Sequence, residues 1–200
     1  MEIWIATGNK GKVQEYDLLL KELGAIALHT QGELSAFSPR PEDGKTFLEN
    51  ARIKAKTLKA VRNKDWVFGE DSGLEVEGLG NLPGIHSARY AGARASDNEN
   101  IAKLLKMMTI RPMANRRARF VCSLVVLTPE GEEWPFEGIM PGEITKAPRG
   151  QLGFGYDPVF VPDGQTQTLA ELGPGFKVTK SHRALAFHQF VSRFKSINTL

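Results

Sequence analysis

Two adjacent carboxylates, Glu70 and Asp71, follow a short apolar run and precede Ser72 and Gly73. The apolar run, residues 66–69, predicts a buried strand, and the Ser-Gly pair predicts a turn. We therefore expect both carboxylates at the carboxyl end of a strand, where open α/β sheets bind their ligands. Neighbouring carboxylates repel each other unless a cation lies between them, and a divalent metal ion is the usual cation. We favour such a site over an ordinary polar turn, because phosphate-binding features occur elsewhere in the chain.

Glu42 is a third candidate metal ligand. If it approaches Glu70 and Asp71 in the fold, the three carboxylates form an oxygen-rich Mg²⁺ site that water and a substrate phosphate complete. Residues 44–46, Gly-Lys-Thr before a helix, look like the end of a P-loop, but Pro39 stands where that motif requires its first glycine. The nearby acids would also repel phosphate, so we exclude a P-loop and keep the metal interpretation.

Residues 7–12, Thr-Gly-Asn-Lys-Gly-Lys, lie between a predicted strand at 3–6 and a predicted helix. The N-terminus of a helix presents unpaired N–H groups and the positive end of its dipole, and both bind phosphate. Glycine lets the backbone approach a ligand closely, and the lysines add positive charge. The alternative is a helix capped by Asn9 with solvated lysines. The candidate phosphate ligands are Thr7, Gly8, Asn9, Lys10, Gly11 and Lys12.

Lys54 is predicted to lie, with Asn50, on the inward face of a second helix that begins at Thr46. A lysine on a buried face needs an anionic partner or a route to solvent. Because acids follow at positions 70 and 71, an anionic partner explains the inward position of Lys54 at least as well as an amine that reaches the surface does. The apolar stripe that defines this face consists of Phe47, Ala51, Ala55 and Leu58.

Residues 153–158 place two aromatic rings and an acid on a flexible, glycine-rich backbone. The ring of Phe154 is suited to stacking on a nucleobase, and the alternative is a packed turn. Lys177 and the pair His182 and Arg183 supply a second polar cluster before the last predicted helix. His182 and Arg183 have N–H groups that can donate to the carbonyl edge of a base, and the alternative is a capped helix start with solvated charges.

The elements that must position these residues alternate between strands and helices. Helical spacing predicts helices after residue 9, from 46, over 98–108 and after 181, and a short helical segment over 87–90. Strands are predicted at 3–6, 25–28, 66–69, 74–76, 117–127, 132–144 and 159–161, of which 117–127 and 132–144 form a long hairpin. Helices between strands together with a hairpin indicate an α/β fold with a mixed sheet. We expect one domain over residues 1–200.

Composition limits the class of protein. The chain has 200 residues, of which 41% are hydrophobic and 24% charged, as in an ordinary soluble domain. The net charge of +3 suits an anionic ligand but does not argue for DNA. The one cysteine, Cys122, lies in an apolar run that predicts a buried structural thiol, and a single cysteine excludes an intramolecular disulfide. Neither a signal peptide nor a membrane-spanning run is apparent, so we expect a cytoplasmic protein.

Six blocks of residues together carry a resemblance to a known family. They are Thr7-Gly8-Asn9-x-x-Lys12, Glu42-x-Gly44-x-Thr46-Phe47-x-Glu49-Asn50-Ala51, Glu70-Asp71-Ser72-Gly73-Leu74, Pro83-Gly84 with Ser87-Ala88-Arg89-Tyr90, Phe154-Gly155-Tyr156-Asp157-Pro158, and Ser181-His182-Arg183. In this order they resemble the inosine/xanthosine triphosphate pyrophosphatases, which hydrolyse non-canonical purine nucleoside triphosphates. The likeness covers nearly the whole chain, and the set is far more specific than any one block.

The resemblance implies Mg²⁺-dependent hydrolysis of ITP, dITP and XTP to the nucleoside monophosphate and pyrophosphate. It implies a homodimer whose small-molecule partner is a nucleoside triphosphate, with no membrane and no stable nucleic-acid partner. It further implies an α/β fold with an elongated mixed β-sheet flanked by helices, in two lobes with a central substrate cleft.

The resemblance also implies roles for individual residues. Asp71 resembles the general base that activates water, and Glu42 and Asp71 resemble metal ligands, with Glu70 adding to them. Residues 7–12 resemble the triphosphate-binding segment, Lys54 a phosphate ligand and Ser72 a substrate contact. The residues that resemble the nucleoside-recognition set are Phe154, Gly155, Tyr156, Asp157, Lys177, His182 and Arg183.

We expect water to attack the α-phosphorus, with Mg²⁺ neutralising charge on the phosphates and pyrophosphate leaving. A 6-oxo purine would accept hydrogen bonds in the region of His182 and Arg183, whereas the 6-amino group of adenine would leave those donors unpaired. One alternative is a pyrophosphatase for other modified nucleotides, such as modified pyrimidine triphosphates. Another is a non-catalytic nucleotide- or RNA-binding module with a steep salt dependence, against which the acids at 42, 70 and 71 argue.

Overall fold

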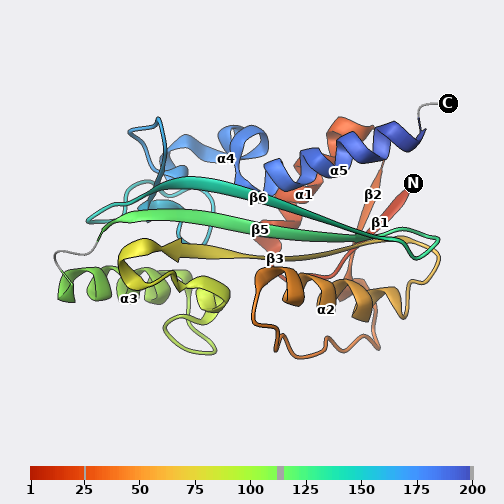
Figure 1. Ribbon diagram of the computed structural model, residues 1–200, viewed down its shortest axis with the longest axis horizontal. Helices are drawn as coiled ribbons and strands as arrows, with labels where there is room; N and C mark the ends of the chain where they lie inside the picture. The colour runs from red at the N-terminus through yellow and green to blue at the C-terminus, as the bar shows by residue number, and fades with distance from the viewer. Residues whose placement is uncertain (25, 112–114, 199–200) are drawn as a thin grey trace. The chain divides into compact units, whose positions relative to one another are not determined.

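The computed structural model describes residues 1–24, 26–111 and 115–198 (Figure 1). Within these residues the fold is mixed α/β, as predicted, with seven strands in one sheet in the order β2-β1-β3-β5-β6-β7 and β4 paired with β3. The strands are β1 (Glu2–Ile5), β2 (Ala27–Thr30), β3 (Trp66–Val76), β4 (Leu82–Pro83), β5 (Arg117–Leu127), β6 (Glu133–Ile144) and β7 (Phe160–Pro162). The α-helices are α1 (Lys10–Leu20), α2 (Phe47–Lys59), α3 (Asp97–Ile110), α4 (Leu169–Lys180) and α5 (His182–Asn198).

The chain forms two compact units. Unit 1 consists of Met1–Asp71, Cys122–Gly138 and Arg183–Leu200, and unit 2 consists of Ser72–Val121 and Ile139–His182. The strands β3, β5 and β6 each contribute residues to both units. The single domain expected over residues 1–200 stays a prediction, and so does the central substrate cleft.

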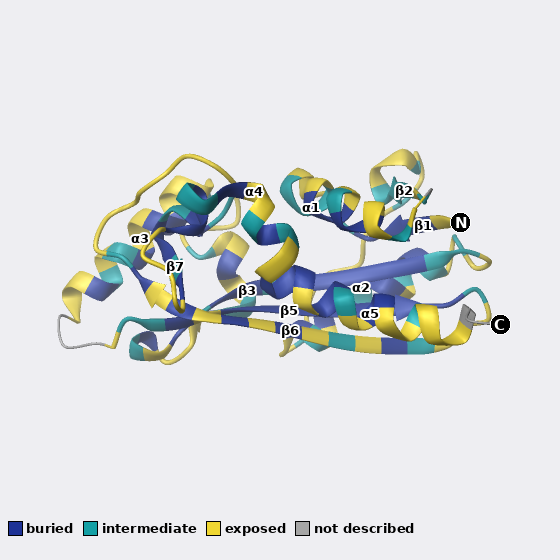
Figure 2. Cartoon of the chain, turned by 90° about the horizontal axis from the view of Figure 1, so that it is seen from above, coloured by how far each residue is buried: buried dark blue, intermediate teal, exposed yellow. Residues whose placement is uncertain are grey.

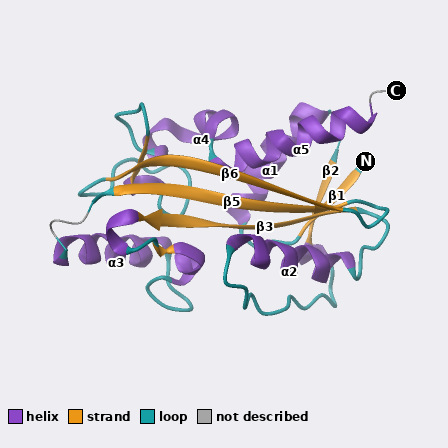
Figure 3. Cartoon of the chain, in the orientation of Figure 1, coloured by secondary structure: helices purple, strands orange, loops and turns teal. Residues whose placement is uncertain are grey.

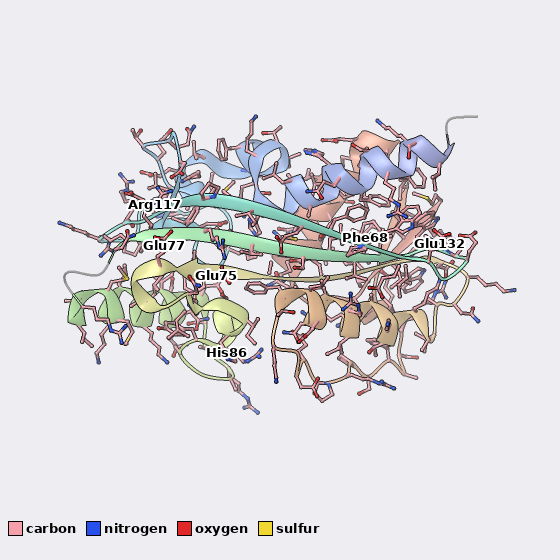
Figure 4. The ribbon with its side chains drawn as sticks, viewed as in Figure 1. Phe68, Glu75, Glu77, His86, Arg117 and Glu132 are labelled. Atoms are coloured by element: carbon pink, nitrogen blue, oxygen red, sulfur yellow. The ribbon has the colours of Figure 1, made fainter. Side chains whose placement is uncertain are left out.

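In unit 1, β1 pairs in parallel with β2 and with β3, so that Ile3 lies opposite Leu28 on one side and Trp66 on the other. Parallel neighbours need a crossover connection, which α1 provides between β1 and β2. Phe68 of β3, labelled in Figure 4, lies in the core and meets the ring of Phe190 edge-on at 5.0 Å between centroids. The strand predicted at 25–28 is observed as β2, and Ala25 lies outside the described residues.

Helix α2 packs closely on β3 in unit 1 because residue 69 is a glycine. A Cβ atom at Gly69 would lie 2.2 Å from the carbonyl oxygen of Ala51 and 2.7 Å from the Cβ of Ala55. The predicted inward stripe of α2 is confirmed, since Phe47, Ala51, Ala55 and Leu58 are all buried. The absent side chain therefore lets the inward face of α2 approach the strand that carries Asp71.

The turn predicted at Ser72 and Gly73 is wrong, because β3 runs without interruption from Trp66 to Val76. Phe68 before the pair and Leu74 after it are fully buried, so packing at both ends of the strand outweighs the local turn preference. Glu70 and Asp71 therefore lie in the middle of a strand and not at its carboxyl end.

Unit 2 is organised around a core that contains Leu74, Leu104 and Phe160. The hairpin predicted over 117–127 and 132–144 is confirmed as β5 and β6, and buried and exposed residues alternate along much of β6 (Figure 2). The helix predicted over 98–108 is confirmed as α3, which begins with a capping box formed by Ser96 and Glu99. The short helical segment predicted over 87–90 belongs to a 3₁₀ helix, Gly84–Arg89.

Helix α4 has no counterpart among the predicted elements (Figure 3). Its start is stabilised by a capping box of Thr168 and Glu171, a recognisable signal. Gly173, with a φ of 75°, interrupts the helical conformation before Pro174, so the sequence here predicts a loop.

None of the helices in the described ranges has the length and apolar character required to cross a membrane.

Candidate functional site

Asp71 and Glu42 meet at one ammonium group in unit 1. Nζ of Lys54 lies 2.8 Å from Oδ1 of Asp71 and 2.9 Å from Oε2 of Glu42. The second carboxylate oxygen of Asp71, Oδ2, accepts a hydrogen bond of 3.2 Å from Nδ2 of Asn50. We call Glu42, Lys54 and Asp71 the acid–lysine centre. It brings together two of the three predicted carboxylates and the predicted phosphate ligand.

The inward position predicted for Lys54 is confirmed, and its partner is an anion. Only 16% of the side chain is exposed. Burial lowers the pKa of the Lys54 amine, but the carboxylates of Asp71 and Glu42 more than offset this, so that the pKa lies above its ordinary value. Lys54 is therefore a permanent cation at neutral pH, held where the two carboxylates converge.

Glu70 points away from the acid–lysine centre, because successive side chains of a strand lie on opposite faces. Its fully buried carboxylate lies 3.3 Å from Nζ of Lys12 and 3.2 Å from Nη2 of Arg183, and it accepts a hydrogen bond from Sγ of Cys122 at 3.6 Å. Arg183 also donates to Glu15. The repulsion expected between Glu70 and Asp71 is thus removed by strand geometry, and each acid has its own cation.

Burial and charge set the ionisation of the groups around Glu70. Burial raises the pKa of the Cys122 thiol well above its ordinary value, and the negative charge of Glu70 raises it further. Burial lowers the pKa of Arg183, but Glu70 and Glu15 raise it by more. Cys122 is therefore a protonated, buried thiol, which agrees with the predicted structural role and gives it no nucleophilic character.

The donor set of the acid–lysine centre fits a magnesium ion that is completed by substrate. Across the described residues, no three His, Cys, Asp or Glu side chains are placed to hold one metal ion. Mg²⁺ is usually bound through one or two carboxylates, with water and phosphate oxygens as the other ligands. Two carboxylates that already converge on one cation, those of Glu42 and Asp71, meet that requirement.

The segment of residues 7–12 forms the start of α1. Asn9 is the N-cap, and its Oδ1 accepts a hydrogen bond of 3.1 Å from the backbone N–H of Lys12, while Oγ1 of Thr7 accepts one from the N–H of Asn9. Gly8 and Lys10 are exposed, and Lys12 is directed at Glu70. The Asn-capped helix start considered from the sequence is thus observed, and phosphate binding by this segment stays a prediction.

In unit 2, the predicted recognition residues around Phe154 form a connected cluster. The buried carboxylate of Asp157 accepts hydrogen bonds from Nζ of Lys177 at 2.6 Å and from the backbone N–H of Phe154 at 3.0 Å. Nζ of Lys177 also lies 4.5 Å from the centre of the Phe154 ring. Gly155 donates to Asp97 through its N–H. The hydroxyl of Tyr156 donates to a backbone carbonyl in the same unit.

The remaining predicted residues lie in different surroundings. His182 is buried in unit 2 and stacks on Phe120, with ring centroids 4.8 Å apart. Arg183, its neighbour in the chain, is buried in unit 1 between Glu15 and Glu70, so the solvated charge considered from the sequence is wrong for this residue. Ser72 is half-buried and directly follows Asp71 on β3.

Two residues of the site were missed by the sequence-based assignment of roles. Asn50, which contacts Asp71, follows Phe47 by three positions, and this spacing was a usable signal for an inward polar group. Glu15 is separated from Arg183 by 168 positions, and nothing local to either residue indicates that they meet.

Fold and site together define a mixed α/β protein with an acid–lysine centre suited to phosphate chemistry. The Ham1 family matches the chain over residues 3–193, and the chain therefore belongs to the Ham1 family. A relative from Bdellovibrio bacteriovorus, a dITP/XTP pyrophosphatase, is 63% identical over 198 residues, which is 99% of this chain and 100% of the relative.

Solved structures agree with this assignment. A HAM1 protein from Coxiella burnetii is 36% identical and superimposes with a TM-score of 0.86, covering 98% of this chain and 99% of that protein. The Ham1 protein of Staphylococcus aureus is also 36% identical, with a TM-score of 0.85 and coverage of 99% and 100%. The family and the fold are thus supported by sequence and by structure over the same length of chain.

Proposed function

We propose that this chain is a pyrophosphatase that hydrolyses dITP, ITP and XTP to the nucleoside monophosphate and pyrophosphate. The observation that carries the proposal is the acid–lysine centre, in which Lys54 is held between Glu42 and Asp71. The name of the Bdellovibrio relative, a dITP/XTP pyrophosphatase, supports the choice of substrate. A protein that only bound phosphate would have no use for two carboxylates at such a place.

Glu42 and Asp71 are the residues that would hold Mg²⁺, together with water and phosphate oxygens of the substrate. When bound, the ion would neutralise charge on the phosphates and orient them for reaction. Glu70 was predicted to add to this set. Its contacts with Lys12, Cys122 and Arg183 favour a different role, and the metal role of Glu70 stays a prediction.

Asp71 is the proposed general base. It removes a proton from the water whose oxygen forms a bond to the α-phosphorus, while the bond from that phosphorus to the bridging oxygen of pyrophosphate breaks. Lys54 and Lys12 lie in unit 1 with Asp71, and they, with the N-terminus of α1, stabilise the negative charge that develops on pyrophosphate. Residues 7–12 bind the phosphates, and Ser72 contacts the substrate.

The cluster around Phe154 is proposed to recognise the nucleobase. The Phe154 ring supplies a stacking surface, and Lys177, held by Asp157, supplies a donor for a carbonyl oxygen. Gly155 and Tyr156 shape this segment, and His182 belongs to the same unit. A 6-oxo purine satisfies such donors, whereas adenine leaves them unpaired. Arg183 pairs with Glu15 and Glu70 and so fixes the start of α5, while its contact with the nucleoside stays a prediction.

We also propose a homodimer, on the strength of family membership. We propose a cytoplasmic location as well, because the single, buried cysteine fits a reducing compartment. Light scattering of the purified protein tests the dimer. A monomer at micromolar concentration would contradict it.

A nucleotide panel tests the proposed function. The purified chain is incubated with Mg²⁺ and with dITP, XTP, ITP, the canonical nucleotides or modified pyrimidine triphosphates, and pyrophosphate and orthophosphate are measured separately. We expect pyrophosphate from dITP, ITP and XTP, with far less from dATP and dGTP. Orthophosphate as the product would contradict the proposal. Preference for modified pyrimidines would favour the alternative substrate class, and binding without turnover, lost steeply with salt, would favour a nucleotide- or RNA-binding module.

A further inference from the structure

Asn50 is a fully buried polar residue at the acid–lysine centre. It lies on α2 between Phe47 and Ala51, two buried residues of the inward stripe. A buried amide must have its donors and acceptor satisfied, or it costs stability. Its partners therefore indicate what the side chain is for.

The two ends of the Asn50 amide contact two different parts of the site. Oδ1 accepts a hydrogen bond of 2.9 Å from the backbone N–H of Gly44, and Nδ2 donates to Oδ2 of Asp71 at 3.2 Å. Gly44 lies two positions after Glu42, and a Cβ atom at Gly44 would lie 2.7 Å from Oδ1 of Asn50. Asn50 thus joins the loop that carries one carboxylate to the other carboxylate.

The chemistry of the amide fixes its orientation. Only the carbonyl end can accept from the N–H of Gly44, so the NH₂ end must face Asp71. An aspartate carboxylate otherwise has a broad torsional preference about its last side-chain bond. With Oδ2 held by Asn50, Oδ1 is the oxygen directed at Lys54 and at the position shared with Glu42.

We propose that Asn50 is a positioning residue for Asp71, and that it sets the orientation of the carboxylate that takes the proton from water. This inference rests on the proposed function, because it assigns the orienting group of the same reaction. Aspartate at position 50 would lack the donor, leucine would lack both groups, and glutamine would carry its amide one methylene farther from the helix. An asparagine is the side chain that satisfies a donor on one side and an acceptor on the other at this length.

The substitution Asn50→Leu tests the proposal, since leucine has the same branching as asparagine and no polar atom. We expect kcat for pyrophosphate release from dITP to fall on the order of 10²-fold, as for a misoriented catalytic group, with KM changed by less than about 3-fold. Asn50→Ala, which leaves room for water, is measured in parallel so that the test does not depend on one variant folding. Activities are normalised to the folded fraction from circular dichroism.

Asn100→Leu is the matched control. Asn100 is also buried on a helix and also bridges backbone groups, since it accepts from the N–H of Ala91 and donates to the carbonyl of Ala88. It lies in unit 2 and has no contact with Asp71. We expect Asn100→Leu to lower the melting temperature without the loss in kcat.

The split between kcat and KM separates positioning from a merely structural role. A folding defect lowers the folded fraction, for which the activities are corrected, whereas a misoriented Asp71 lowers the kcat of the folded chain at nearly unchanged KM. A loss confined to KM in both Asn50 variants would overturn the inference. A wild-type chain that releases no pyrophosphate overturns the proposed function and this inference with it. Turnover by the wild type with full kcat in Asn50→Leu overturns the inference alone.

Discussion

Nζ of Lys54 lies 2.8 Å from Oδ1 of Asp71, on the strand that the inward face of α2 approaches. The contact depends on Gly69, whose missing side chain lets α2 come close to β3. Glu42 approaches the same ammonium group from a loop. One positive and two negative charges therefore share a partly buried position, and removing the cation leaves two carboxylates to repel each other.

Replacing Lys54 by methionine is expected to raise KM and lower kcat for dITP, and to lower stability in a way that depends on pH. The pKa of Lys54 lies above its ordinary value in the folded chain, since the charges of Asp71 and Glu42 more than offset the effect of burial. A raised pKa gives stabilisation that is complete below the unfolded pKa, about 10.4, and is lost as pH rises through the folded pKa. The difference in melting temperature between wild type and Lys54→Met should stay constant from about pH 7 to 9.5 and shrink above about pH 10.5. A difference that already disappears between pH 7 and 9 would contradict this account.

Replacing Glu70 by glutamine distinguishes a metal ligand from a buried ion-pair partner. Loss of one member of a buried pair typically costs roughly 3–5 kcal/mol, because the partner charge stays buried. We expect Glu70→Gln to lower the free energy of unfolding in urea by an amount of that order, and to leave the Mg²⁺ concentration for half-maximal activity unchanged. Glu133→Gln is the control, since Glu133 pairs with Arg52 where both side chains are partly exposed, and its cost should be about 1 kcal/mol or less. A large rise in the Mg²⁺ requirement of Glu70→Gln would restore the metal role.

Cys122 is expected to be inert in the folded protein. Its thiol is fully buried, and its pKa is raised by burial and by the charge of Glu70. A thiol reagent at pH 8 should label Cys122 only after unfolding, and Cys122→Ala should keep wild-type kcat while losing about 1 kcal/mol of stability to the cavity. Rapid labelling of the native chain, or loss of turnover in Cys122→Ala, would show a functional thiol.

If the chain is a single domain, as predicted, we expect it to unfold in one cooperative transition. All three tryptophans, Trp4, Trp66 and Trp134, lie in unit 1, so their fluorescence reports that unit alone. Circular dichroism reports the helices of both units. We expect the two signals to change at the same urea concentration, because β3, β5 and β6 contribute to both units. Separate midpoints would show two domains that unfold independently.

Much of the fold follows from local patterns in the sequence. The predictions of the inward stripe of α2 and of the hairpin of β5 and β6 were correct, because periodicity and burial agree along each of those elements. The pair Ser72 and Gly73 was misjudged, because a turn preference of two residues competes with packing at both ends of an eleven-residue strand. Helix α4 was not predicted, because Gly173 and Pro174 favour a loop although the capping box before them indicates a helix start.

The candidate site was less predictable than the fold. Sequence spacing placed Lys54 on the correct face, because both the residue and its stripe belong to one helix. Glu70 and Asp71 lie on opposite faces because both belong to one uninterrupted strand, and the turn predicted from Ser72 and Gly73 hid this separation. The ion pair of Arg183 with Glu15 joins residues 168 positions apart, and such a contact is set by tertiary structure alone.

The most direct test of the account is pyrophosphate release from dITP by Asp71→Asn, compared with the wild type at saturating Mg²⁺ in a single-turnover experiment. Asparagine keeps the size of the side chain and its contact with the Lys54 region, but it cannot take a proton from water. We predict that Asp71→Asn still binds dITP and releases no measurable pyrophosphate on the time scale of the wild-type reaction. Release at the wild-type rate would remove Asp71 from the role of base and contradict the account.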